Sequence, residues 1–551
     1  MTTPTTLEVD PEFPPADDTP TPASRPTAAA AGALGAALAL SIGEAAAAFN
    51  DNISSLVTAI GEFVIDITPG DLIAESINNI GTLQKPLLLG GITLVSLLIG
   101  AWLGVKGRRQ PSIVPMGFAF FGLVGALAAA RSQLTSTGSA WAVALLAAAA
   151  GAVVTLVLLG VSKRPAGAPT GALVPGTPLT QAADRRRFLT FSGAAVGTAA
   201  VWGASRVGGT SAAERARQEI LTQTTASTTT VPGAEPVVTT PLPTGQFDDV
   251  AGITSHLTPI SPEDEFYLID TALSKPQVDP STWSLTIDGM VDTPVSYTYD
   301  ELLQRDMVTR EVTLSCVSNP IGGNLVGNAQ WRGIPLSELF EEAGIQDPTS
   351  FESQVFMRSV DGFTCGFPTP LAYDGRTAML ALEMNGEPLP INHGFPARIV
   401  VAGLYGYVSA TKWIEQISIT EWDGVDGFWI PRGWSKEGPV KTQSRIDVPR
   451  TGSRVDAGPV TVAGIAWSPT IGIDRVELSF DQGESWQVAE LANTENDESW
   501  VQWKYDWTAT PGEYLVGVRA TDKSGFTQSP IPVAPAPNGA EGYHVSRIIV
   551  G

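Results

Sequence analysis

Residues 309–345 read TREVTLSCVSNPIGGNLVGNAQWRGIPLSELFEEAGI, and this stretch predicts three successive elements. Val312, Leu314 and Cys316 alternate with other residues, which is the pattern of a half-buried strand. A loop rich in Gly and Asn follows, and LSELFEEAG then has the apolar spacing of an amphipathic helix. Cys316 at the strand end is either a small buried hydrophobic residue or a reactive thiolate, and its local sequence leaves both interpretations open.

The composition limits the classes of protein to which this chain can belong. The chain has 551 residues, enough for several domains, and a formal net charge of −23. Nucleic acid is not an expected partner, because its phosphates require a basic surface. The two cysteines, Cys316 and Cys365, lie far apart and outside any CxxC or Cys/His spacing. The sequence therefore predicts neither a zinc site nor a disulfide framework.

Apolar stretches in the first two hundred residues predict a bundle of five transmembrane helices. Four of them have the roughly 17–25 residues that span the hydrocarbon of a bilayer, and the last is shorter. The first is rich in Ala and contains Glu44, so a buried or interfacial helix is the alternative for it. The five stretches are residues 28–49, 86–105, 112–130, 139–161 and 188–204.

Loop charges predict the orientation of this multi-pass bundle in a cell membrane. The basic clusters KGRR, SKR and DRRRF fall on the opposite side from an acidic loop. By the positive-inside rule, residues 1–27 form a disordered cytoplasmic N-terminus, and everything after the fifth helix is extracytoplasmic. The acidic loop contains Asp51, Glu62, Asp66 and Asp71.

The fifth helix carries a second signal. DRRRFLTFSGAAVGTAAVWGA, residues 184–204, resembles a twin-arginine export signal placed internally. Such signals are associated with domains that fold, often around a cofactor, before they cross the membrane. An ordinary stop-transfer helix with cytoplasmic arginines is the alternative. Residues 206–247 are rich in Thr and Pro, cannot build a core, and are expected to form a linker.

Two globular parts follow the linker. Residues 248–438 mix strands (WSLTIDG, ARIVVAG, EQISITEW) with short helices (TYDELLQ, PLSELFEEAG), which predicts an α+β domain. Residues 439–551 give one strand after another: VTVAGIAW, IDRVELS, SWVQWKYDW and GEYLVGVRATD. The alternation in Trp503, Tyr505 and Trp507 is typical of antiparallel strands and predicts an all-β immunoglobulin-like sandwich.

Several motifs in order then resemble one family. FYLIDTALSKPQVDPSTWSLTIDGMVDTPVSYTYDELL, VTLSCVSN, WRGIPLSELFEEAGI, MNGEPLPINHGFPARIVVAGLYGYVSATKWI and GPVKTQSRIDVP follow one another as in the sulfite oxidase family of molybdopterin oxidoreductases. The resemblance covers more than half of the chain, from about residue 266 to the end. The terminal sandwich is similar to that family's dimerisation domain, which implies a homodimer, with a monomer as the alternative for a protein that has a membrane bundle. Because independent motifs agree, the resemblance favours the metal-binding interpretation of Cys316.

The resemblance implies a molybdenum–molybdopterin cofactor and a set of site residues. Cys316 would be the catalytic thiolate on molybdenum, since a soft anionic sulfur suits a redox metal. His393, Arg398 and Lys412 would contact the pterin, the last two by supplying positive charge to its phosphate. The remaining expected neighbours of the pterin are Tyr267, Ser359, Ser409 and Thr411.

Other candidates have a structural interpretation. Cys365 in DGFTCGFP is expected to be a buried thiol on a loop near the pterin, and Trp331 to pack beneath the metal loop. His256 and His544 belong to none of the shared motifs and are expected to be structural.

The sequence departs from the family after the metal cysteine. Sulfite oxidases carry arginines there for their anionic substrate, whereas this loop reads CVSNPIGGN. Sulfite is therefore not favoured, although Arg332 or Arg358 could replace the missing charge. No segment resembling cytochrome b5 is found and the apolar helices contain no histidine, so a separate electron donor or acceptor is expected.

Two classes of function are consistent with the sequence. The first is a membrane-tethered molybdopterin oxidoreductase that transfers an oxygen atom to or from a small molecule, or reduces it, with Cys316 on the metal. The second is a cofactor-free membrane-anchored binding protein with an immunoglobulin-like module. A cysteine hydrolase is a distant third, because no histidine is an evident partner for either thiol.

Overall fold

The computed structural model describes residues 22–50, 53–69, 72, 76, 80, 83–131, 136–163, 178–206, 211–227, 246–247, 250 and 258–551. The chain divides into two compact units. One contains residues 1–66 and 83–209, and the other contains residues 67–82 and 210–551. The first is helical, and the second holds all the strands that the structure describes.

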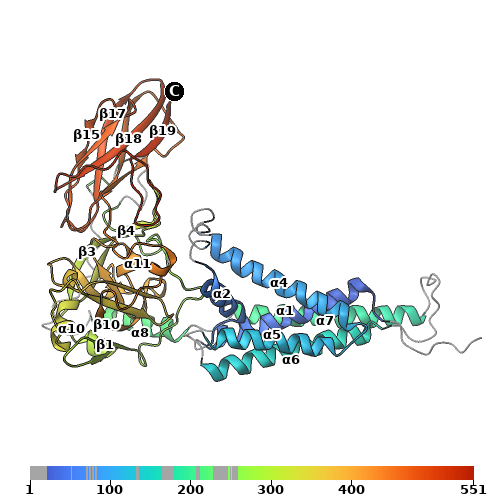
Figure 1. Cartoon of the computed structure of the whole chain (residues 1–551). Coiled ribbons are helices and arrows are strands. Elements are labelled where there is room, and N and C mark those ends of the chain that lie inside the picture. Colours follow the sequence, from blue (N-terminus) through green and yellow to red (C-terminus); the bar gives the residue numbers. More distant parts are fainter. Residues whose placement is uncertain are drawn as a thin grey trace, which may run out of the picture. The chain divides into compact units, whose positions relative to one another are not determined.

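The helical unit contains each predicted apolar stretch as a helix (Figure 1). Three helices, α1, α4 and α6, are long and apolar enough to cross a membrane, whereas α5 and the apolar part of α7, Leu189–Trp202, are shorter. The bounds are α1 Arg25–Phe49, α2 Leu56–Ile67, α4 Gln84–Gly107, α5 Ile113–Ala129, α6 Thr137–Val161 and α7 Pro178–Arg206.

Small residues bring α1 and α4 together. A Cβ atom added to Gly32 would lie 2.0 Å from the carbonyl oxygen of Gly100, so the two backbones touch at this point. Such close approach at glycine is how helices pack in lipid, where van der Waals contact rather than hydrophobic burial drives their association. Helix α1 also packs against α6 and α7.

Two segments expected to lack structure contain helices. Glu62 and Asp66, predicted in a loop, lie in α2, because Leu56, Val57 and Ala59 give that segment a buried apolar face. Helix α8, Ala212–Ser227, lies inside the predicted linker. Its Arg217 donates hydrogen bonds to the carbonyl oxygens of Pro388 and Leu389, both at 3.1 Å, which docks the helix beside strand β8 within the second unit. The Thr/Pro-rich residues 228–245 lie outside the described part of the chain.

Two five-stranded sheets and three short helices build residues 284–421, which confirms the predicted α+β character. One sheet has the order β2-β1-β10-β5-β6, and the other has β3-β4-β7-β8 with β9 paired to β7. The bounds are β1 Ser284–Gly289, β2 Val295–Thr298, α9 Tyr299–Leu303, β3 Val308–Ser315, β4 Val326–Pro335, α10 Leu336–Ala343, β5 Ser353–Ser359, β6 Thr364–Pro368, β7 Ala378–Met384, β8 Glu387–Pro388, β9 Arg398–Val401, α11 Gly406–Ser409 and β10 Ile414–Glu421.

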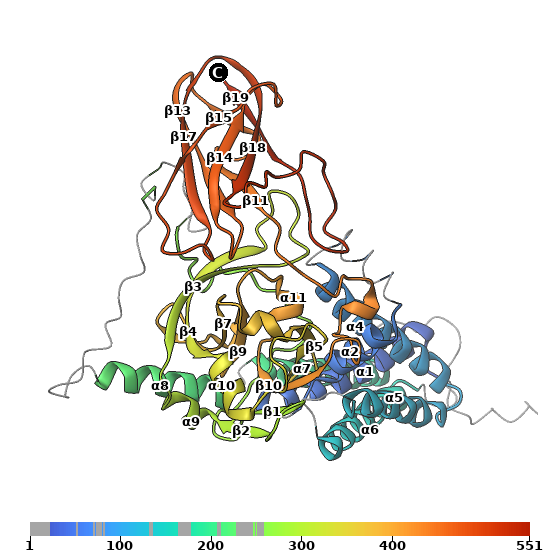
Figure 2. The same ribbon diagram turned by 60° about the vertical axis from the view of Figure 1, so that its left-hand side comes forward.

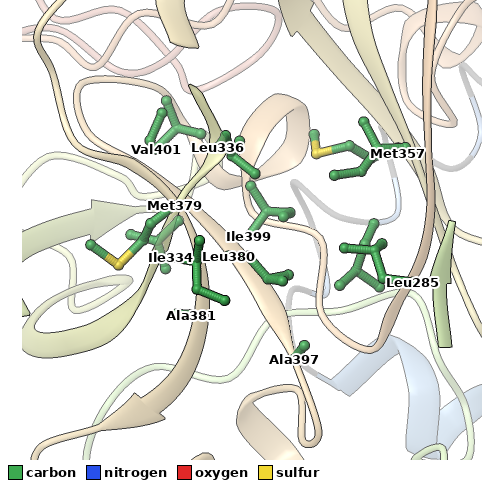
Figure 3. Packing of buried hydrophobic residues seen from close by; sticks show 14 of the residues in the cluster. Leu285, Ile334, Leu336, Met357, Met379, Leu380, Ala381, Ala397, Ile399 and Val401 are labelled. Atoms are coloured by element: carbon green, nitrogen blue, oxygen red, sulfur yellow. The ribbon is translucent and has the colours of Figure 1, made fainter. Parts of the chain in front are cut away.

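The core of this part lies between the two sheets (Figure 3). Leu285 on β1 and Met357 on β5 come from one sheet, and Ile334, Leu380 and Ile399 come from strands of the other. All five side chains are fully buried. Because both sheets contribute apolar faces to one core, their strand ends are held in fixed positions, including the end of β3 at Cys316.

The C-terminal part is β-rich, as predicted (Figure 2). One sheet has the order β11-β13-β17-β16 and the other β12-β19-β18-β14-β15, and side chains such as Val462 and Val518 place both in one core. The bounds are β11 Gln443–Val448, β12 Ser453–Val455, β13 Gly458–Trp467, β14 Ile473–Ser479, β15 Gln487–Val488, β16 Glu490–Leu491, β17 Val501–Ala509, β18 Gly512–Asp522 and β19 His544–Val550.

Candidate functional site

Strand β3 ends at Ser315, and Cys316 is the next residue. Ser315 pairs with Val326 at the end of the β3–β4 ladder, and the amide of Cys316 then donates to the carbonyl oxygen of Leu325 at 2.9 Å. The side-chain oxygen of Asn319 accepts from the amide of Leu325, also at 2.9 Å. These bonds close residues 316–325 into a compact loop, which we call the cysteine loop.

The C-terminal part holds the far side of the cysteine loop. Arg445 on β11 donates to the carbonyl oxygen of Gly323 at 2.8 Å, and it forms an ion pair with Asp447 at 2.8 Å. The ring of His544 lies against Gly322, which has a φ of 69°; a Cβ atom there would be 2.3 Å from the ring. The His544 Nδ1 atom accepts from the amide of Ile446 at 3.0 Å. His544 is structural, as expected, but it supports the loop that carries Cys316.

A cavity opens beside Cys316. It brings together five of the predicted site residues: Tyr267, Cys316, Ser359, Arg398 and Lys412. Residues that the sequence analysis did not single out complete the lining: Phe266, Ile269, Asp270, Thr271, Val317, Ser318, Asp361, Phe363, Gly406, Tyr407, Ala410, Trp413, Trp429 and Trp434.

Arg398 is a buried cation at the start of β9, with 4% of its surface exposed. One terminal nitrogen donates to the carbonyl oxygen of His393 at 3.1 Å, and the guanidinium carbon lies 4.8 Å from the ring centre of Trp331. Its Nε atom is buried and has no hydrogen-bond partner among the described residues. Burial lowers the pKa of Arg398 to about 10. The side chain is therefore positioned to receive an anion.

Lys412 is the second cation in the lining and is also buried. Its ammonium group donates to Asp270 at 2.9 Å and to the carbonyl oxygen of Asn392 at 3.0 Å. Burial lowers its pKa to about 8, while Asp270 opposes the shift. Asp270 also pairs with Lys275. Asp270 was missed by the sequence analysis; the only signal was a carboxylate at the end of the apolar run FYLI.

The thiol of Cys316 and the hydroxyl of Tyr267 lie in an environment that disfavours anions. Burial raises the pKa of Cys316, and hydrogen bonding with Ser318 partly opposes this. Burial also raises the pKa of Tyr267, with the neighbouring Cys316 adding to the shift and Arg398 opposing it. A bound metal cation would reverse this balance for Cys316, because coordination favours the thiolate.

Three predicted pterin neighbours are not part of the cavity lining. His393 uses Nε2 to bond the carbonyl oxygen of Glu263 at 2.9 Å, and burial followed by Arg398 lowers its pKa to about 3, so the ring is neutral. Ser409 donates to the carbonyl oxygen of Tyr405 at 3.1 Å. Thr411 lies 3.1 Å from the sulfur of Cys365, which confirms Cys365 as a buried thiol, although it lies in strand β6 and not on a loop. Each side chain is turned toward backbone or core by these bonds.

The arginines considered as replacements for the substrate-binding charge also lie outside the lining. Arg332 pairs with Glu383 at 2.5 Å, and Arg358 is exposed on β5. Trp331 is fully buried and donates to the carbonyl oxygen of Val312 at 3.2 Å, so it packs beside the strand that carries Cys316, close to its expected place. His256 lies outside the described residues.

The residues present fit a cofactor that brings its own metal ligands. Within the described part of the chain, no group of three or more His, Cys, Asp or Glu side chains could hold a metal ion. A metal at Cys316 must therefore obtain most of its ligands elsewhere, as molybdenum does from the dithiolene of a pterin. The buried Nε atom of Arg398, which has no hydrogen-bond partner among the described residues, suits the pterin phosphate in the same cavity.

Comparison with known families agrees with this geometry. Residues 272–429 match the oxidoreductase molybdopterin binding domain, and residues 438–533 match the Mo-co oxidoreductase dimerisation domain. This part of the chain is similar to molybdopterin-dependent oxidoreductases of the sulfite oxidase family. Its cofactor is molybdenum–molybdopterin.

Known relatives match only part of the chain. Mitochondrial sulfite oxidase of Macaca fascicularis is 31% identical over 48% of this chain and 56% of its own length. Nitrate reductase of Hordeum vulgare is 26% identical over 46% of this chain and 35% of its own. The chain thus spans about half the length of sulfite oxidase. The solved sulfane dehydrogenase SoxCD of Paracoccus pantotrophus is 21% identical with a TM-score of 0.46, covering 58% of this chain and 93% of its own.

Proposed function

We propose that the chain reduces a small oxo compound, or transfers an oxygen atom to or from it, at a molybdenum held by Cys316. The observation that carries this proposal is the shared cavity of a buried strand-end thiol and a buried arginine with an unsatisfied Nε atom. When bound, the cofactor supplies a two-electron centre that exchanges an oxygen atom with the substrate.

The chain's own residues have separable tasks in this proposal. Cys316 anchors the metal, and the cysteine loop fixes the direction of its sulfur. Arg398 binds the pterin phosphate, and Lys412 adds positive charge that Asp270 partly neutralises. Tyr267 and Ser359 line the same cavity and can orient the pterin. The cofactor-free binding protein is not favoured, because it would leave the buried Arg398 without an anion.

Replacing Cys316 tests the metal assignment. Cys316→Ala removes a soft ligand but little volume, so the protein should fold while turnover falls by at least about a hundredfold. Cys365→Ala is the matched control, since it also removes a buried thiol, and it should keep most of the activity. The measurements are molybdenum and pterin content, the paramagnetic Mo(V) signal and turnover with reduced viologen. Wild-type activity in Cys316→Ala would refute the assignment.

We further propose that the helical unit spans a membrane and tethers the catalytic part on its extracytoplasmic side. Supporting this, large apolar side chains on the long helices are exposed, including Leu98, Trp102, Leu146 and Val153, and lipid would cover them. The stretch at 184–204 is proposed to act as a twin-arginine-like signal.

Cysteine labelling in intact cells tests this topology. Both native cysteines are buried, so Lys163→Cys and Ser485→Cys each add one exposed thiol. A membrane-impermeant maleimide should label Ser485→Cys before lysis and Lys163→Cys only afterwards. The reverse order would exclude the proposed orientation.

Electrons are proposed to come from or go to a separate partner protein. In the described residues of the helical unit, α1, α2 and α4–α7 contain no histidine that could ligate haem. The dimerisation domain at 438–533 supports a homodimer as the working assembly.

A further inference from the structure

Helix α8 packs within the second unit by one face. Ala213 is fully buried in the core of the α+β part, and Ala216 and Ile220 pack against the same core. Arg217 lies on this face too, because residues three or four positions apart share one side of a helix. The helix precedes residues 272–429, which match the molybdopterin binding domain, and so lies outside that match.

Arg217 joins α8 to β8. Its Nε atom donates to the carbonyl oxygens of Pro388 and Leu389, both at 3.1 Å. One terminal nitrogen lies 3.2 Å from a carboxylate oxygen of Glu387 and 3.6 Å from one of Glu263. Only 12% of the Arg217 side chain is exposed. Because a guanidinium holds its donors in a rigid fork, these contacts fix the end of β8 against the helix.

Residues 388–393, which we call the carbonyl turn, hold three side chains of the cavity lining. The consecutive carbonyl oxygens of residues 391, 392 and 393 accept from Trp413 at 2.9 Å, Lys412 at 3.0 Å and Arg398 at 3.1 Å, respectively. All three donors line the cavity beside Cys316. The carbonyl turn therefore fixes the positions of both buried cations of the site.

Glu263 gives α8 a second connection to the carbonyl turn. Its carboxylate pairs with Arg217, and its carbonyl oxygen bonds Nε2 of His393 at 2.9 Å. Helix α8 thus holds the start of the turn directly, at residues 388 and 389, and the end of the turn through Glu263. Removing the guanidinium of Arg217 would loosen both ends at once.

We infer that α8 braces the cofactor site and that Arg217 is a positioning residue, which fixes the carbonyl turn and through it Arg398 and Lys412. This inference rests on the proposed function, in which these two cations hold the pterin phosphate. Arg217 is not part of the cavity lining, so it acts through the backbone of the turn and not by touching the cofactor. Without the brace the cofactor should still bind, but less tightly, because the cations are no longer held in place beforehand.

Arg217→Met in the full chain tests the brace. Methionine keeps much of the packing volume but has no donors, so pterin and molybdenum should be lost during dialysis about fivefold faster or more. Arg217→Lys keeps the charge but cannot bond both carbonyl oxygens with a fork, and its rate of loss should be intermediate. If Arg217→Met does not fold, Arg217→Lys provides the comparison. Arg215→Met is the matched control, since Arg215 is exposed on the same helix and donates to the carbonyl oxygen of Ser211 at 3.4 Å.

Hydrogen exchange in cofactor-free protein reports on the carbonyl turn without turnover. The amide of His393 donates to the carbonyl oxygen of Pro390 at 2.9 Å, inside the turn. Peptides that contain this amide should exchange several-fold faster in Arg217→Met and at the wild-type rate in Arg215→Met. Cys316, which the cysteine loop holds, should be alkylated at the wild-type rate in both variants. This last comparison distinguishes a loosened turn from a loosened domain.

The outcomes separate this inference from the proposed function. If the wild type contains molybdenum and Arg217→Met retains it as well as Arg215→Met does, the brace is overturned and the proposed function stands. Faster cofactor loss with unchanged exchange in the carbonyl turn also overturns the brace, because Arg217 would then act by another route. A wild-type protein without molybdenum overturns the proposed function, and the brace with it.

Discussion

At the scale of single residues, the site combines a buried thiol, two buried cations and hydroxyl groups that come from distant parts of the sequence. Tyr267, Cys316, Ser359, Arg398 and Lys412 could be predicted from their motifs, and they meet in one cavity. His393, Ser409 and Thr411 were predicted from the same motifs but point elsewhere. A motif places the backbone near the cofactor, whereas hydrogen bonds to Glu263, Tyr405 and Cys365 decide where each side chain points.

Arg398 gives the first prediction at this scale. Arg398→Met keeps much of the packing against Trp331 but removes the charged donors, which are worth about 1.5–3 kcal/mol when they bind an anion. Cofactor retention should therefore weaken by about tenfold to a hundredfold. The measurement is pterin and molybdenum content after dialysis.

Arg332→Met is the matched control for Arg398→Met. Arg332 comes from strand β4 of the same sheet, is partly exposed, and pairs with Glu383 outside the cavity. Its cofactor content should equal that of the wild type. Equal retention in both variants would show that Arg398 does not hold the phosphate.

At the scale of elements, the strands of the second unit were the most predictable features. The segments WSLTIDG, ARIVVAG and EQISITEW became β1, β9 and β10. Strand β9 is buried throughout, whereas buried residues in β1 and β10 are interspersed with more exposed ones, and both arrangements leave a local apolar pattern in the sequence. Helix α8 was missed for the opposite reason. Its sequence is polar, and its docking depends on Arg217 reaching backbone oxygens about 170 residues later in the chain.

The support of the cysteine loop by β11 and β19 yields a prediction for these elements. Arg445→Lys keeps the charge but cannot bond both Asp447 and the Gly323 carbonyl oxygen with a guanidinium fork. The loop should loosen, so that Cys316 in cofactor-free protein is alkylated several-fold faster. Thiol-labelling kinetics followed by peptide mass analysis measure this rate for each cysteine.

The Arg445→Lys measurement has two controls, a second cysteine in the same protein and a second variant. Cys365, bonded to Thr411 away from the loop, should keep its alkylation rate. Arg547→Lys changes an exposed ion pair with Glu513 in the same part of the chain and should affect neither cysteine. If Cys316 reacts at the wild-type rate in Arg445→Lys, the loop does not depend on β11.

At the scale of the whole molecule, the match to a dimerisation domain predicts a mass of two chains. Light scattering on the detergent-solubilised protein, with the detergent contribution subtracted, measures this mass. A single-chain mass throughout the micromolar range would contradict the homodimer. Deleting residues 439–551 is unsuitable as a control, because the deletion also removes Arg445 and His544 from the cysteine loop.

The support that β19 gives to the cysteine loop also sets an order of events during biosynthesis. Cys316 leaves the ribosome more than two hundred residues before His544, the residue that lies against Gly322. The loop is therefore incomplete throughout that interval, and a nascent chain cannot yet hold it in its final geometry. The cofactor is therefore expected to bind only after β19 has been translated. If the protein crosses a membrane with its cofactor bound, it must cross in the folded state.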